Sequence, residues 1–167
     1  MTSFSIQRFL EECELSSQKA YDAFKGILFQ SCEMKDIKNT YNCLNILFDF
    51  YEKTDDKKLF LEKYHFSFKT ILLGGHRNKL RLIQFPSIFS PEEWSFTFYE
   101  GLSRLPNSTF TGKKISELGC GNGWICLSLA LNTDLDFIFG LDINPRAIIC
   151  AKLNLAFNSF ESDEKAA

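Results

Sequence analysis

The feature that most constrains this chain is a glycine-rich turn, GCGNG, that lies between two predicted strands. The first strand is predicted over 114–118, directly before the turn, and an apolar helix is predicted over 124–131. A second strand, over 137–141, ends at Asp142. A strand, a tight turn, a helix and a strand that ends in an acid form half of a nucleotide-binding fold. The order therefore predicts an α/β domain with a ligand site at the turn.

The three glycines and the acid each meet a physical need of such a site. Gly119 lets the chain turn sharply after the strand, and Gly121 leaves out a side chain where a ligand must approach the backbone. Gly123 permits close contact between the helix and a strand. Asp142 can accept hydrogen bonds from both hydroxyls of a ribose. The combination predicts a cofactor that contains a nucleoside.

The spacing and charge of the turn favour S-adenosylmethionine over a dinucleotide. The dinucleotide fingerprint is GxGxxG, whereas here the third glycine comes one residue early and Trp124 follows it. Glu117 stands two residues before the first glycine, where a carboxylate suits a positively charged ligand and opposes a pyrophosphate. S-adenosylmethionine carries an ammonium, a sulfonium and a ribose. The pattern ExGxGxG resembles motif I of the class I methyltransferases, and a nicotinamide-dependent oxidoreductase is the least favoured alternative.

Three longer segments narrow this resemblance. PSIFSPEEWSFTFYEGL at 86–102, SELGCGNGWICLSLA at 116–130 and GLDINPRAI at 140–148 resemble the N-terminal methyltransferase part of the plant-type methionine S-methyltransferases. YHF at 64–66 and HRNKL at 76–80 fit the same family. The resemblance implies transfer of a methyl group from S-adenosylmethionine to the thioether of methionine, which yields S-methylmethionine. The methyl acceptor is therefore expected to be a small molecule, methionine.

The resemblance also implies roles for individual residues. Glu117 would lie near the methionine part of the cofactor, Asp142 would hold the ribose, and Ile143 would lie against the adenine. The backbone wall beside the cofactor would come from the turn itself: Gly119, Cys120, Gly121, Asn122 and Gly123. The mouth of the site would be lined on the substrate side by Pro91, Glu92 and Trp94.

Two interpretations stay open for the aromatic residues Trp94, Phe96 and Phe98. They form either an ordinary packed helix face or a wall whose rings attract a sulfonium by cation–π interaction. No catalytic base is expected, because a thioether sulfur attacks with a free lone pair and has no proton to lose. No metal site is expected, since none of the six cysteines forms a CxxC pair and no histidine lies at ligand spacing from them.

The chain divides into three predicted parts. Residues 1–64 are predicted to be helical, with a charged link over 52–58. Residues 65–112 are predicted to form a substrate-side hairpin and helix, with a strand from His65, a turn at Gly74–Gly75 and a second short strand over 80–83. The helix is expected over 91–103, with Ser90 as its cap and Pro91 in its first turn.

Residues 113–167 are predicted to form the first βαβ part of an S-adenosylmethionine-binding domain. The expected fold class is thus α/β: a helical N-terminal extension followed by the first part of a Rossmann-like class I methyltransferase sheet. Because such sheets have five or more strands, we expect a truncated sheet, weak or no activity of the isolated chain, and self-association through the open edge. The alternative function is a non-catalytic remnant or interaction domain that keeps part of the fold.

Charge and hydropathy exclude several other classes. Nineteen basic and twenty-one acidic side chains leave a net charge of -2, which disfavours a nucleic-acid partner or an anionic membrane surface. No apolar run approaches the ~18 residues of a membrane span. The N-terminus lacks the basic region of a secretory signal. A cytoplasmic location with reduced thiols is expected.

Overall fold

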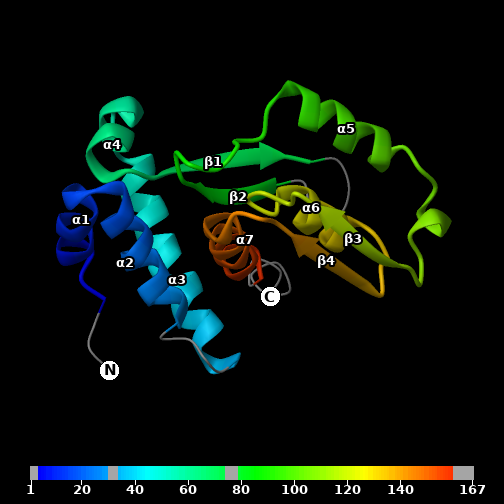
Figure 1. Cartoon of the computed structure of the whole chain (residues 1–167), viewed down its shortest axis with the longest axis horizontal. Helices are drawn as coiled ribbons and strands as arrows, with labels where there is room; N and C mark the ends of the chain where they lie inside the picture. Colours follow the sequence, from blue (N-terminus) through cyan, green and yellow to red (C-terminus); the bar gives the residue numbers. More distant parts are fainter. Residues whose placement is uncertain (1–3, 30–33, 74–78, 160–167) are drawn as a thin grey trace.

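A computed structural model of the chain describes residues 4–29, 34–73 and 79–159. Four helices gather at one end of the molecule, and a small parallel sheet lies at the other (Figure 1). The helices of the first end are α1 (Ile6–Leu15), α2 (Ser17–Phe29), α3 (Met34–Glu52) and α4 (Lys57–Tyr64). The remaining elements are β1 (Ser67–Leu72), β2 (Lys79–Gln84), α5 (Glu93–Ser103), a 3-10 turn (Asn107–Thr109), β3 (Lys114–Leu118), α6 (Trp124–Asn132), β4 (Phe137–Leu141) and α7 (Pro145–Asn158).

Two separate two-stranded sheets are present in the described part of the chain. β1 and β2 pair antiparallel, with Ser67 opposite Gln84, which confirms the predicted hairpin. β3 and β4 pair in parallel, with Lys114 opposite Phe137, and α6 connects them. The mixed α/β class is therefore confirmed. The glycine pair predicted to turn the hairpin, at 74–75, lies outside the described residues.

The ends of two helices follow the expected capping chemistry. The hydroxyl oxygen of Ser16 accepts a hydrogen bond from Lys19 N at 3.2 Å and so caps α2. Asn144 caps α7 by accepting from Arg146 N at 3.0 Å, and Pro145 occupies the first helical position. Both caps satisfy N–H groups that have no partner inside the helix.

Three predicted boundaries were wrong. α4 begins at Lys57, inside the predicted charged link, because the side chain of Asp56 accepts from Leu59 N at 2.8 Å and starts the helix. His65 ends this helix in a left-handed conformation (φ 60°) and does not begin a strand. α5 begins at Glu93, not at Pro91, and Ser95 Oγ accepts from Glu92 N at 3.1 Å. The hydroxyl of Ser90 instead accepts from Lys69 Nζ at 3.4 Å.

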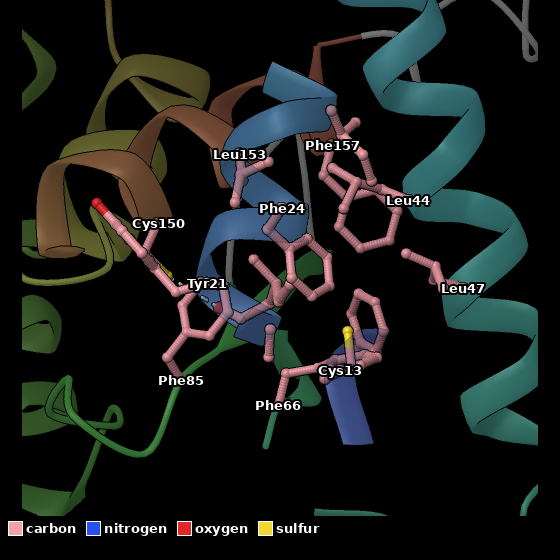
Figure 2. Packing of buried hydrophobic residues seen from close by; sticks show 14 of the residues in the cluster. Cys13, Tyr21, Phe24, Leu44, Leu47, Phe66, Phe85, Cys150, Leu153 and Phe157 are labelled. Carbon is pink, nitrogen blue, oxygen red and sulfur yellow. Dashed lines mark hydrogen bonds between the residues drawn. The ribbon is translucent and has the colours of Figure 1, made fainter. Parts of the chain in front are cut away.

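The larger core joins α1–α4, the hairpin and α7. Phe24 and Phe66 are fully buried, with their ring centroids 4.8 Å apart and nearly perpendicular. Figure 2 shows Phe24 in the middle of the labelled side chains, with Leu44 and Leu47 of α3 on one side and Tyr21 and Phe85 on the other. Edge-to-face aromatic packing of this kind adds to the stability gained from apolar burial. The many phenylalanines of the sequence are thus used mainly as core.

Helix α7 also closes the outer edge of β2. The side-chain amide of Asn154 accepts from Ile83 N at 2.7 Å and donates to Ile83 O at 3.3 Å. One helical turn later, Asn158 accepts from Arg81 N at 3.1 Å and donates to Arg81 O at 2.8 Å. These two amides satisfy backbone groups that a neighbouring strand would otherwise pair.

The second core lies between the hairpin, α5 and α6, and it covers only one face of the β3–β4 sheet. Trp124 is buried there and its ring lies 5.3 Å from that of Tyr99. The opposite face of the sheet exposes apolar side chains: Leu118, Phe137, Phe139 and Leu141. No helix in the described ranges is long and apolar enough to cross a membrane.

Candidate functional site

The glycine turn has the backbone geometry that its sequence predicts. Gly119, Gly121 and Gly123 all have positive φ angles, of 72°, 55° and 79°. Residues with a side chain rarely adopt this region, which explains the need for glycine. Gly119 N and Cys120 N both donate to Leu141 O, at 2.8 and 3.0 Å. The turn is therefore anchored to the end of β4.

The second and third glycines of the turn, Gly121 and Gly123, differ in what surrounds them. A Cβ atom placed on Gly121 would meet no atom within 4 Å, so the backbone there is accessible to a ligand. A Cβ atom on Gly123 would lie 2.9 Å from Ala151 Cβ. The close approach at Gly123 is therefore to helix α7, not to a strand as the sequence suggested. A side chain at Gly123 would push α7 away from the start of α6.

The structure brings the predicted acid against the turn. Asp142 Oδ2 accepts from Gly121 N at 2.8 Å, and Oδ1 accepts from Asn144 N at 2.8 Å. A carboxylate has about four lone-pair positions, so each oxygen keeps one for a ligand. The next residue, Ile143, is fully exposed and presents an apolar surface beside the acid.

Glu117 lies at the end of β3 and is partly buried. Its Oε2 accepts from Cys126 N at 3.1 Å, in the first turn of α6. Because the residue before α6 is Gly123, which has no capping side chain, Glu117 supplies the negative charge that a helix N-terminus favours. Burial raises the pKa of Glu117, while its hydrogen bonds to Cys126 lower it in part.

Cys120 is a buried thiol between two acids. Burial is the main cause that raises its pKa to about 11, and the charges of Glu117 and Asp142 add to the effect. The thiol therefore stays protonated at neutral pH and is a poor nucleophile. This environment agrees with a role for the Cys120 backbone only. No group of three or more metal-binding side chains occurs among the residues that the structure describes.

Asn122 points away from the open side of the turn. It is 1% exposed, and its Nδ2 donates to Gln84 Oε1 at 2.9 Å while its Oδ1 accepts from Trp124 N at 3.2 Å. Its carbonyl accepts from Asn154 Nδ2 at 2.9 Å. The side chain of Asn122 thus stabilises the turn from its buried side, whereas the sequence predicted that it would lie beside a cofactor.

Gln84 connects the turn to the segment that leads to α5. Its Nε2 donates to Ile88 O at 2.7 Å, while its Oε1 accepts from Asn122. A second contact joins the same parts, since Asn144 Nδ2 donates to Ser87 O at 3.5 Å. Gln84 was not among the residues predicted from the sequence, although a glutamine within the apolar run LRLIQF was a signal that a buried amide is needed there.

The predicted substrate-side residues surround an open hollow of about 640 Å³. Pro91 is buried, Glu92 is exposed, and Trp94 is 68% exposed, so its ring is available to a ligand. Phe96 is not available in this way, because the Lys69 ammonium lies 5.6 Å from its ring centroid and Trp124 packs against it at 5.2 Å. Phe96 is therefore part of ordinary helix packing. For the exposed Trp94, the interpretation as a ring that attracts a cationic ligand stays open.

Comparison with known proteins identifies the family of this chain. Residues 79–166, more than half of the chain, match the methyltransferase small domain family. The chain belongs to that family. The matched region of this methyltransferase small domain begins at β2 and contains the glycine turn, Glu117 and Asp142.

Individual relatives confirm the resemblance seen in the sequence. The domain and its helical extension are 40% identical to methionine S-methyltransferase of Arabidopsis thaliana and 40% identical to that of Wollastonia biflora, in each case over 95% of this chain. The chain spans only 15% of the length of these relatives. A shorter match, 35% identical over 60 residues, is to ribosomal protein L11 methyltransferase of Vibrio cholerae and covers 36% of this chain and 20% of that relative.

Proposed function

We propose that this methyltransferase domain binds S-adenosylmethionine at the turn between β3 and α6. The observation that carries the proposal is the hydrogen bond from Gly121 N to Asp142 Oδ2. This bond holds the ligand-accessible backbone of the turn after β3 against the acid that follows the neighbouring strand, β4. Membership of the methyltransferase small domain family supports the same cofactor.

The residues present fit this cofactor. Gly121 leaves space beside the backbone, and Asp142 keeps lone pairs for the ribose hydroxyls. The exposed Ile143 offers an apolar surface to the adenine. The partly buried carboxylate of Glu117 suits the ammonium and sulfonium charges. Asn122 takes the role of a positioning residue, since its side chain faces Gln84.

We further propose methionine as the methyl acceptor, because methionine S-methyltransferases are the longest matches described above. The cofactor, when bound, supplies a methyl group on a sulfonium. A lone pair of the acceptor sulfur forms the new S–CH₃ bond as the old one breaks, so the protein needs no base. Its residues would instead align the acceptor and exclude water, and the exposed ring of Trp94 would stabilise the cationic sulfur.

Calorimetry on the purified chain tests the cofactor. We expect S-adenosylmethionine and S-adenosylhomocysteine to bind more tightly than NAD. Asp142→Asn should weaken adenosyl binding by about tenfold or more, because it replaces charge-assisted hydrogen bonds by neutral ones. Asp136→Asn, at an exposed acid before β4, is the matched control and should bind normally. Tighter binding of NAD, or equal effects of the two substitutions, would contradict the proposal.

A second candidate function is a non-catalytic interaction domain, and the exposed apolar face of the β3–β4 sheet favours it. Leu118 is 79% exposed and Phe137 54%, an arrangement that also promotes self-association. A labelled-methyl transfer assay with methionine as acceptor separates the two functions. Labelled S-methylmethionine would support the enzyme. Because the isolated chain is expected to have weak or no activity, only the absence of both transfer and adenosyl binding would favour the interaction domain.

A further inference from the structure

A small pocket lies beside the loop that follows β2, and no residue of the glycine turn lines it among the described residues. Its volume is about 70 Å³, and side chains from four separate segments line it. The polar ones are Ser17 and Tyr21 of α2, His65 after α4, Ser87 of the loop, and Arg146 of α7. All of these side chains can donate a hydrogen bond, and none of the described lining residues is acidic.

Arg146 supplies the charge of this pocket. It lies in the first turn of α7, and its guanidinium is held 5.2 Å over the ring of Tyr21. It also donates to Gln18 Oε1, and Gln18 Nε2 in turn donates to Asp22 Oδ1 at 2.9 Å. Among the described residues, no carboxylate lies within 4.0 Å of the guanidinium. The positive charge is therefore held in place without a direct ion-pair partner.

Tyr21 provides a second hydrogen-bond donor for this pocket. The residue is only 9% exposed, yet within the described ranges its hydroxyl has no hydrogen-bond partner. The hydroxyl is not among the fully buried unpaired side-chain atoms of the described residues, so it reaches the open space of the pocket and can donate to a ligand there. Burial raises the pKa of Tyr21, while the nearby Arg146 acts in the opposite direction. The hydroxyl thus stays a donor at neutral pH.

We propose that this pocket binds the carboxylate group of a small molecule. Arg146 and the hydroxyl of Tyr21 would donate to the carboxylate, with Ser17, His65 and Ser87 at its rim. One guanidinium matches a single negative charge, and the acid beyond Gln18 disfavours the second charge of a phosphate dianion. The site does not depend on the proposed methyl transfer, although Ser87 O accepts from Asn144 Nδ2 near the predicted ribose position.

An NMR titration with acetate at constant ionic strength tests the proposal. Acetate should shift the amide signals of Ser17, Tyr21 and Ser87. Arg146→Met and Tyr21→Phe should each weaken acetate binding by about tenfold, the loss of one charge-assisted interaction. Arg104→Met, at an exposed arginine of the C-terminal end of α5, is the matched control and should leave the affinity unchanged.

Three results would overturn the proposal. They are the absence of saturable shifts at these amides, acetate binding that ignores both substitutions, and tighter binding of inorganic phosphate than of acetate. The amide spectrum of each variant away from α2 and α7 reports whether the fold is intact. If Arg146→Met fails this check, Tyr21→Phe decides alone, since it removes one oxygen and keeps the packed ring.

Discussion

The two ends of the molecule use apolar side chains in opposite ways. In the helical end, Phe24 and Phe66 are completely buried between helices and the hairpin. In the βαβ end, α6 covers one face of the β3–β4 sheet, and Phe137 and Phe139 stand on the other face, about half exposed. The difference indicates that stability resides mainly in the first region, while the second region supplies surfaces that face ligands or other protein.

The two sheets differ in the same way, because one is covered by neighbouring groups and the other leaves apolar side chains exposed. The outer edge of β2 is paired by the amides of Asn154 and Asn158, so α7 closes the hairpin without a third strand. On the β3–β4 sheet, the described residues leave Leu118 and Leu141 exposed at the strand ends that flank the glycine turn. An exposed apolar sheet face of this kind is a typical protein contact surface.

The largest expected effect is on stability. Phe24→Ala should lower the free energy of unfolding by about 3–5 kcal/mol, because it removes a fully buried ring and leaves a cavity. Phe139→Ala, on the exposed sheet face, should change it by about 0.5 kcal/mol or less. Urea unfolding followed by circular dichroism measures both. Similar losses in the two variants would show that the two regions are equally packed.

The next effect concerns the ligand site. Gly121→Val should weaken adenosyl binding by about 100-fold or more, since a branched side chain would fill the open space and resist the positive φ angle. Gly112→Val is the matched control, because Gly112 has a φ of 67° and also open surroundings, outside the turn. Calorimetry on both variants compares them. Normal binding by Gly121→Val would remove this glycine from the site.

A smaller effect is expected for self-association through the exposed sheet face. Phe139→Lys should lower the association constant by about tenfold, because it places a charge within the apolar patch. Phe98→Lys changes a side chain of similar exposure, 55%, on α5 and serves as control. Sedimentation velocity at several concentrations gives the constants. If both variants associate equally, the sheet face is not the contact surface.

The smallest effect should come from Glu117. Burial raises the pKa of this carboxyl in the folded state, so ionisation above its ordinary value of 4.5 costs stability that is retained at lower pH. Glu117→Gln should therefore raise the melting temperature by about 2–4 °C at pH 7. The gain should disappear as the pH falls well below 4.5, where Glu117 is protonated in both the folded and the unfolded wild-type chain. A gain that does not change with pH would contradict burial of the charge as its cause.

The sequence alone predicted the elements whose causes are local. The order of strand, glycine turn, helix and strand over 114–141 is confirmed, and the glycines of the turn have the positive φ angles that suit this residue. The cap at Ser16 and the proline that opens α7 have equally local causes. Each of these depends on residues a few positions apart, where backbone sterics and capping rules apply directly. The family resemblance likewise follows from the order of residues alone.

Only the tertiary structure decided how these elements support one another. Asn122 turns inward because Gln84 and Asn154, which are 38 and 32 positions away, present partners for its buried groups. Gly123 is needed because Ala151 of another helix lies against it. The pocket at Arg146 exists because α2, with Tyr21, packs beside α7. Rules that act within a few residues cannot predict such contacts, since each depends on where distant segments meet in the folded chain.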